Sequence, residues 1–197
     1  IASGQLSAPK RLMTDLLEHT ESVFQNGLLT NIPIEEVLQR QDIQVARIHS
    51  STPRFSWQMA SEEPNTIQSA FQIQVATNPE LLLKDTPDMW NSRKVISPKN
   101  TAIIYAGKQL KPNTCYYWSV RVWNQNDSIS PDSEIKAFVT ANEFSQTISR
   151  YPLIKRKEYA KSITRYPDSY FIDFGNATFG QLDFTLFSHR TNDTVTL

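Results

Sequence analysis

Apolar and polar positions alternate most regularly in the stretch LKPNTCYYWSVRVW, which runs from Leu110 to Trp123. Successive side chains of an extended chain point to opposite faces, so every second residue of this stretch shares a face. One face carries Tyr116, Trp118, Val120 and Val122, and the other carries Tyr117, Ser119, Arg121 and Trp123. The pattern predicts a strand with one face in a core and the other able to meet water.

The residues just ahead of this strand fit a tyrosine corner. Leu110 lies six residues before Tyr116, and Pro112 and Thr114 occupy the approach. In a tyrosine corner the phenol hydroxyl binds backbone a few residues upstream and fixes the connection into the strand. The segment is therefore interpreted as the sixth strand of a fibronectin type III-like (immunoglobulin-like) sandwich, with Trp118 in its core.

Other segments between residues 54 and 140 also have the alternation of strands. RFSWQM, from Arg54, places Trp57 at a position expected inside, and SAFQIQVA alternates apolar residues with glutamines. Between strands, Pro79 to Lys84 (PELLLK) predicts a helical turn with proline at its first position. The segment from Glu134 to Thr140 is expected to be the last strand of this module. The predicted fold class is all-β, with a short helical insertion over residues 33–41.

The first fifty residues allow two interpretations. Between Arg11 and Phe24, Leu12 and Leu16 begin a helical stripe, yet a type III module is expected to start with a strand led in by Pro9. The module logic favours the strand. The segment PIEEVLQRQ, residues 33–41, predicts a helix with Asn31 as a candidate cap and two glutamates in its first turn, where the helix dipole favours anions.

The last fifty residues change in character. Two Tyr-Pro pairs, Tyr151-Pro152 and Tyr166-Pro167, enclose five basic residues and indicate a linker or a polar edge strand. A second all-β region starts at Tyr170, with Leu182, Phe184 and Leu186 alternating against polar neighbours. This region stops inside a strand and is expected to be incomplete, because an open sheet edge leaves backbone groups unpaired. The predicted organisation is a sandwich with an amino-terminal extension over 1–141, a linker over 142–168 and the start of a second sandwich over 169–197.

The composition excludes several classes of function. Twenty basic and twenty acidic residues cancel, so no long-range field would draw the chain to nucleic acid. No run of about 18 apolar residues occurs, so no membrane span is predicted. The one cysteine, Cys115, is expected to be a buried thiol. Metal-ligand spacing, a nucleophile elbow and a phosphate-binding loop do not occur in the sequence, so we predict no catalytic residue, no metal and no cofactor.

The tryptophans are the remaining candidates for ligand binding. An exposed indole can stack on a sugar ring, whereas a buried one fills a core. Trp90, in DMWNSRKV, and Trp123, on the opposite face from Trp118, could be exposed and are the candidate sugar-stacking residues. Core packing is the commoner role for tryptophan in a sandwich.

Five ordered motifs resemble the amino-terminal type III-like module of bacterial α-L-rhamnosidases. They are PRFSWQM, QSAFQIQVAT, DMWNSRKV, YAGKQLKPNTCYYWSVRVWN and SEIKAFVT, within Pro53 to Thr140. Phe71 stands where the family has tyrosine, and Asn91 and Arg93 stand where it often has aspartate and glycine. The later segment YFIDFGNATFGQLDFTL is similar to the start of the family's next domain, a β-sandwich.

The resemblance implies a parent enzyme that hydrolyses rhamnosides with inversion, using one acid and one base carboxylate. The family's catalytic acids lie in a later (α/α) barrel, which has no counterpart in these 197 residues. The chain is then expected to be a non-catalytic accessory module whose partners are the remaining domains of its own polypeptide. The parent would act on rhamnose-containing glycans of plants or bacteria and would be exported from a bacterial cell. The alternatives are a carbohydrate-binding module and a cell-surface protein-interaction module.

Overall fold

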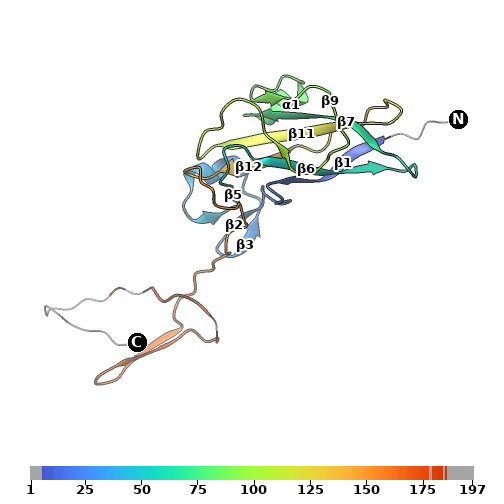
Figure 1. The fold of residues 1–197 in the computed structure, drawn as a ribbon. Helices are drawn as coiled ribbons and strands as arrows, with labels where there is room; N and C mark the ends of the chain where they lie inside the picture. Colours follow the sequence, from blue (N-terminus) through green and yellow to red (C-terminus); the bar gives the residue numbers. More distant parts are fainter. Residues whose placement is uncertain (1–5, 178, 184, 186–197) are drawn as a thin grey trace. The chain divides into compact units, whose positions relative to one another are not determined.

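The computed structural model describes residues 6–177, 179–183 and 185. These residues form two compact units, the first ending at Arg156 and the second beginning at Lys157. The boundary lies inside the segment 142–168 that the sequence predicts as a linker. The first unit is an all-β sandwich, as predicted, and most of its strands lie in two layers (Figure 1).

The first layer is a sheet of three strands in the order β1-β6-β10. Its strands are β1 (Leu6–Thr14), β6 (Arg54–Ser61) and β10 (Ile103–Ile104), and both outer strands run antiparallel to β6. The pairing of β1 with β6 shifts register twice, once on each side of Lys10. Such irregularities are typical of edge strands, because they make the exposed backbone a poorer template for another strand.

The second layer is a larger sheet in the order β5-β12-β11-β7-β8, with β9 also paired to β7. Its strands are β5 (Arg47–Ile48), β12 (Lys136–Thr140), β11 (Cys115–Asn124), β7 (Gln68–Ala76), β8 (Trp90–Asn91) and β9 (Val95–Ile96). The helix α1 (Pro79–Leu83) follows β7 and begins with the predicted proline. The Asn78 side chain caps it by accepting a hydrogen bond from the Glu80 amide at 2.9 Å.

The main core lies between these two layers and is rich in aromatic rings. Trp118 is fully buried, and its ring centroid lies 4.4 Å from that of Phe55. Both buried indoles have partners for their N–H groups: Trp118 donates to Thr14 Oγ1 at 3.1 Å and Trp57 donates to Gln68 Oε1 at 2.9 Å. The prediction that Trp57 and Trp118 lie inside is therefore confirmed.

The tyrosine corner is present as predicted. The Lys111 amide donates to the Tyr116 hydroxyl at 2.8 Å, and both Tyr116 and Leu110 are buried. A backbone amide that would otherwise need another partner is thus bound by a side chain from the start of β11. The bond fixes the turn over residues 111–115 against the strand that the turn leads into.

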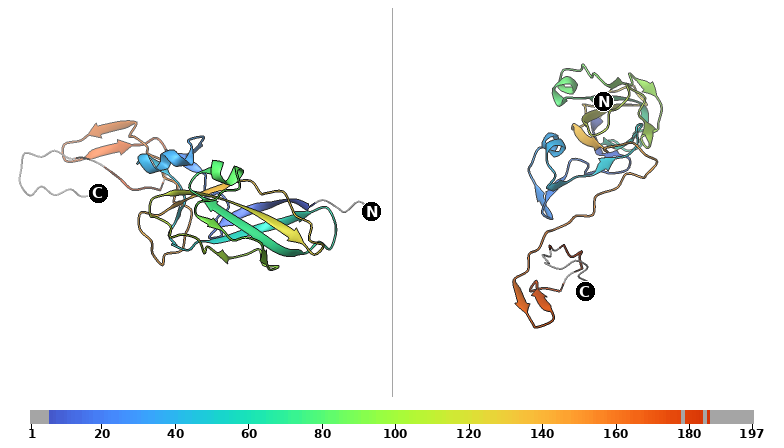
Figure 2. Two further views of the ribbon diagram at one scale, coloured as in Figure 1. Left: turned by 90° about the horizontal axis from the view of Figure 1, so that it is seen from above. Right: turned by 90° about the vertical axis from the view of Figure 1, so that its left-hand side faces the viewer.

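A second apolar cluster lies on the outer side of the second sheet. A small sheet in the order β3-β2-β4 and the 3-10 helix η1 (Ile34–Gln39) belong to this side of the unit (Figure 2). The small sheet consists of β2 (Val23–Gln25), β3 (Leu28–Thr30) and β4 (Ile43–Gln44). The cluster contains Val23, Ile34, Val37, Val45, Ala76, Leu82, Cys115, Tyr117, Ala137 and Val139. The start of β11 is thus buried on both faces, so the prediction that its Tyr117 face meets water is wrong there.

The amino-terminal segment differs from the prediction in extent. The favoured strand is confirmed only as far as Thr14, because Asp15 and Leu16 have φ angles of 49° and 66° and turn the chain away from β6. Leu16 is 66% exposed, so it does not extend a buried helical stripe from Leu12. The segment forms a strand and not a helix because β6 supplies hydrogen-bond partners for its backbone groups.

The helix expected over residues 33–41 is shorter and tighter than predicted. It is a 3-10 helix that begins after Pro33, and the Asn31 side chain does not cap it. Its two buried residues, Ile34 and Val37, are three apart, which suits a helix of three residues per turn. The glutamates Glu35 and Glu36 lie in its first turn, as predicted.

The second unit is described as a hairpin with extended chain around it. Strands β13 (Ser162–Arg165) and β14 (Tyr170–Asp173) pair antiparallel, so the β-region predicted from Tyr170 begins with a strand. The aromatic and aliphatic side chains of this hairpin are exposed on both of its faces. Phe184 and Leu186, on which the next predicted strand depends, lie outside the described residues.

Candidate functional site

Trp90, one of the two candidate sugar-stacking residues, is directed toward the core. It pairs with the buried Val75 across β7 and β8, so the two side chains share the inner face of the sheet. Its ring centroid lies 5.3 Å from that of Tyr105 and 6.3 Å from that of Phe55. The ring is half-buried and packs as an extension of the aromatic core.

The chain needs a residue without a side chain at position 107, and the sequence has Gly107 there. A Cβ atom at position 107 would come within 2.5 Å of Trp90 Cβ and 2.6 Å of the Met89 carbonyl oxygen. Such distances do not allow a methyl group unless the backbone moves. The glycine therefore permits the loop before Leu110 to lie directly against Trp90, with the Tyr105 hydroxyl bonded to the Lys108 carbonyl oxygen at 2.6 Å.

Trp123, the other candidate, lies on the outer face of the same sheet. Its side chain is half-buried, and the Lys94 ammonium is 4.9 Å from the ring centroid, within the range of a cation–π contact. Lys94 also pairs with the Asp127 carboxylate. One face of the indole is thus already in contact with a charged side chain.

The two candidate tryptophans therefore do not form one binding platform. Trp90 belongs to the inner face of the second sheet and Trp123 to its outer face, with β7 between their strands. Sugar binding by either residue stays a prediction. A sugar that stacked on the same face of Trp123 as Lys94 would have to displace that ammonium.

Next to Trp123, the outer face of the sheet carries an ion-paired network around Arg121. The Arg121 guanidinium contacts both oxygens of Asp132, at 2.7 and 3.1 Å, and one oxygen of Asp85 at 3.3 Å. The carboxylates are exposed, so each pair contributes at most about 1 kcal/mol to stability. The network gives this face a fixed polar surface.

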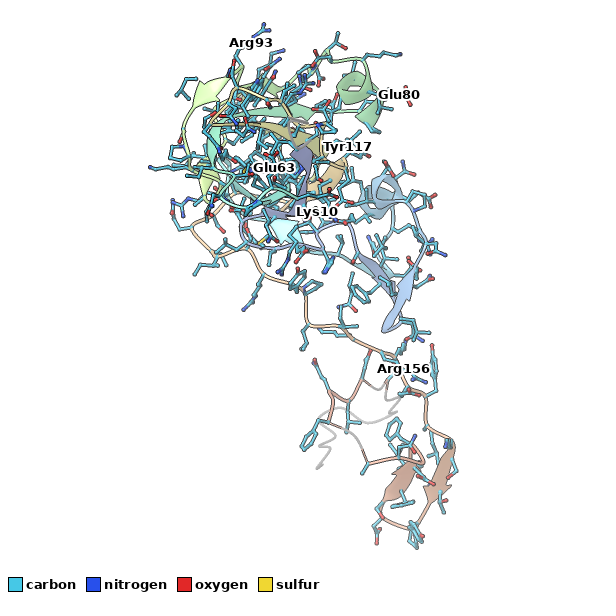
Figure 3. The ribbon with its side chains drawn as sticks, turned by 90° about the vertical axis from the view of Figure 1, so that its right-hand side faces the viewer. Lys10, Glu63, Glu80, Arg93, Tyr117 and Arg156 are labelled. Carbon is cyan, nitrogen blue, oxygen red and sulfur yellow. The ribbon has the colours of Figure 1, made fainter. Side chains whose placement is uncertain are left out.

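A second group of polar side chains joins β11 to the small layer, the name used here for the sheet β3-β2-β4 together with η1. Tyr117, labelled in Figure 3, belongs to β11. Its hydroxyl donates to a carboxylate oxygen of Glu35 in η1. Burial, together with this hydrogen bond, raises the pKa of Tyr117 above its usual value. Burial raises the pKa of the neighbouring Cys115 thiol to about 11, so the thiol is protonated and inert at neutral pH, as expected of this residue.

Lys136 makes a comparable link from β12. Its ammonium lies 2.5 Å from Glu21 Oε1 and 3.4 Å from Glu134 Oε1. Burial opposes the charged form, but the two carboxylates outweigh it, and the pKa of Lys136 is raised. The pair with Glu21 ties the connection between β1 and β2 to the second sheet.

The residues from Phe144 to Lys155 form an extended segment, here called the strap, that is bound along the first unit. Sequence reasoning treated this segment as linker and did not find its contacts. The Tyr151 hydroxyl accepts from the amides of Glu18 and His19, at 3.0 and 3.1 Å. The Ser149 hydroxyl donates to Asp15 Oδ2 at 2.7 Å and accepts from the His49 amide at 3.1 Å.

The strap continues along the small layer. The Gln44 side chain donates to the Leu153 carbonyl oxygen at 2.6 Å and accepts from the Lys155 amide at 2.8 Å. Phe144, at the other end, packs against the main core. The strap is thus held at its beginning, middle and end, and its contacts reach elements far away in the sequence.

Neither a metal centre nor a membrane span emerges from the described parts of the chain. Over residues 6–177, 179–183 and 185, His, Cys, Asp and Glu side chains do not gather in groups of three or more that could hold a metal ion. In the same residues, every helix is too short or too polar to cross a membrane.

Comparison with known families decides which family the sandwich represents. The family described as Rha78A-like, N-terminal immunoglobulin domain matches residues 38–142, more than half of the chain. The chain belongs to this family. The match begins inside η1 and contains β4 to β12, so β1, which completes the first sheet of this Rha78A-like domain, lies upstream of the matched residues.

The relatives of this Rha78A-like domain are alpha-L-rhamnosidases by name. One from Formosa agariphila is 39% identical over 111 residues, which are 56% of this chain and 12% of that protein. One from Streptomyces avermitilis is 45% identical over 105 residues, 53% of this chain and 10% of that protein. A solved alpha-L-rhamnosidase from Dictyoglumus thermophilum matches with a TM-score of 0.56 and 26% identity, over 72% of this chain and 13% of that one. The chain thus spans about a tenth of the length of these relatives.

Proposed function

We propose that this chain is the non-catalytic amino-terminal module of an α-L-rhamnosidase-like glycoside hydrolase. In this proposal it stabilises and positions the catalytic (α/α) barrel, which lies elsewhere in the parent polypeptide. The observation that carries the proposal is the family match over residues 38–142, together with relatives named alpha-L-rhamnosidase of which the chain covers only about a tenth.

The contacts of the first unit support a structural role. Its tryptophans are used mainly inside: Trp57 and Trp118 are buried, and Trp90 stacks in the aromatic core. The strap that leads out of the unit is fixed by hydrogen bonds at several points. A domain connected through a fixed segment is restrained in orientation, whereas a flexible linker would leave it free to move.

The deletion of residues 1–156 from the full polypeptide tests the proposal. The cut is placed at Arg156 because the strap packs with the first unit. We expect lower soluble yield and a lower unfolding temperature, while any enzyme that does fold still releases rhamnose with inverted anomeric configuration, as followed by NMR. A well-folded deletion variant without hydrolytic activity would contradict the proposal, because the module would then take part in the reaction.

Export of the parent protein from a bacterial cell remains part of this proposal. Cell fractionation followed by immunoblotting against the first unit tests it. We expect the protein outside the cytoplasm, and a purely cytoplasmic signal would rule export out.

A further inference from the structure

Exposed apolar side chains gather along the strap. We call this set the strap row; it consists of Leu16, Leu29, Ile148, Tyr151, Leu153 and Ile154, whose exposed fractions run from 38% for Ile154 to 83% for Ile148. Of the other large exposed apolar residues described on the sandwich, Leu28 lies beside Leu29 in β3, whereas Leu83 in α1 and Ile96 in β9 belong to separate elements. Isolated exposed apolar residues are ordinary, whereas a contiguous group marks a surface that binds something.

Hydrogen bonds join the chain segments that carry the strap row. Ser149, next to Ile148, bonds to Asp15, next to Leu16. Gln44 bonds to the Leu153 carbonyl oxygen and also faces Phe24, whose other cross-strand neighbour is Leu29. Cross-strand neighbours share one face of a sheet, so Leu29 and Gln44 lie on the same face of the small layer. The Gln44 side chain is the one that binds the Leu153 carbonyl oxygen.

The strap row is also fixed in advance of any binding event. The bonds of Tyr151, Ser149 and Gln44 hold the strap backbone, so little conformational entropy remains to be lost there when a partner binds. The same bonds that restrain the connection also present the exposed apolar side chains of the strap on a fixed backbone, as a docking surface requires.

Two other groups of residues on the first unit are weaker candidates for a binding surface. The outer face at Trp123 is occupied by ion pairs and by Lys94. The Cys115 and Tyr117 group is buried under the small layer. Among these candidates, all on residues that the structure describes, the strap row is the one that combines exposure, apolar character and a fixed backbone.

We propose that the strap row is the surface on which a later domain of the same polypeptide docks. The proposal rests on the proposed function above, because it requires a longer parent protein. The occupant follows from two observations: the relatives are about ten times longer than the matched residues, and the strap is the segment that connects the sandwich to the sequence after it. Domains joined in this way meet over modest, partly apolar interfaces, which suits a row of about six side chains.

Site-specific photo-cross-linking in the full polypeptide tests the docking surface. Leu153→p-benzoylphenylalanine places the probe in the strap row, at a side chain that is 80% exposed. Ile96→p-benzoylphenylalanine, at a side chain that is 78% exposed on β9, is the matched control. After irradiation at low protein concentration, peptide mapping by mass spectrometry identifies the partner segment.

We expect the probe at position 153, and not the one at 96, to form an intramolecular cross-link to sequence beyond residue 197. Cross-links between two copies, cross-links confined to these 197 residues, or equal yields at 96 and 153 would overturn the proposal, as would a complete lack of cross-links. Hydrolysis of an aryl α-L-rhamnoside is measured on the same samples. Activity without the cross-link refutes only the docking surface, whereas the cross-link without activity refutes only the proposed enzyme.

Discussion

The substitution Tyr151→Phe isolates the central bond of the strap, because it removes the hydroxyl and leaves the ring. That hydroxyl accepts from two amides, those of Glu18 and His19, at 3.0 and 3.1 Å. A typical intramolecular hydrogen bond contributes about 0.5–1.5 kcal/mol net. The site is exposed, so water replaces part of each lost bond, and we expect a local cost of about 1–2 kcal/mol for the pair.

Hydrogen exchange measures this cost at the two amides themselves. A local cost of about 1.4 kcal/mol corresponds to roughly tenfold faster exchange when exchange occurs through local opening. We therefore expect Glu18 and His19 to exchange about tenfold faster in Tyr151→Phe, while the amides of β7 and β11 keep their rates. Tyr159→Phe, in the second unit, is the control and should leave both amides unchanged.

Two outcomes would refute the reasoning about Tyr151. Unchanged exchange at Glu18 and His19 would mean that the hydroxyl does not protect these amides. Faster exchange spread over the whole sandwich would mean that the substitution lowers global stability and that the strap is not a separate, local element.

Two further predictions concern the interior. Tyr116→Phe should lower the free energy of unfolding by about 1–3 kcal/mol, because the Lys111 amide loses its buried acceptor. Urea unfolding measures this loss. An equal loss in the exposed control Tyr166→Phe would count against a specific role of the tyrosine corner. Burial raises the pKa of the Cys115 thiol from 9.0 to about 11, so the folded state resists ionisation that the unfolded state allows. This contribution to stability is complete below about pH 9 and is lost as the pH rises toward 11, so Cys115→Ala should weaken the loss of stability between these pH values. Urea midpoints that fall equally in both proteins would show that Cys115 does not cause the loss.

The parts of the fold that sequence alone predicts are those with a local signature. The tyrosine corner needs only Leu110 and Tyr116 at a fixed spacing, and the alternation around Trp118 is readable within one strand. Both features depend on residues close together in the chain. For the same reason α1 was predictable, because its proline and its length are local properties.

The missed parts depend on contacts between distant residues. Tyr151 lies more than 130 positions from the amides that it binds, and a Tyr-Pro pair in a basic segment gives no sign of them. The small layer was missed for a related reason. Tyr117 looked like a solvent-facing position, yet it is buried because residues 23–45 cover that side of β11.

The candidate site was predictable in part. The half-buried position of Trp123 agrees with its place opposite Trp118 on β11. For Trp90 the sequence suggested an indole that could be exposed, whereas pairing of β8 with β7 turns it toward Phe55 and Tyr105. A strand of only two residues has too short a pattern for its facing to be read from sequence.

The position of β1 upstream of the family match has a consequence for any fragment trimmed to residues 38–142. Such a fragment would keep β6 but lose the strand that covers one of its edges. The bare edge would offer free amide and carbonyl groups to any extended chain, which invites aggregation. It would equally accept a peptide with the sequence of Leu6–Thr14, so the sandwich can be completed by donated strand in the manner of pilin subunits.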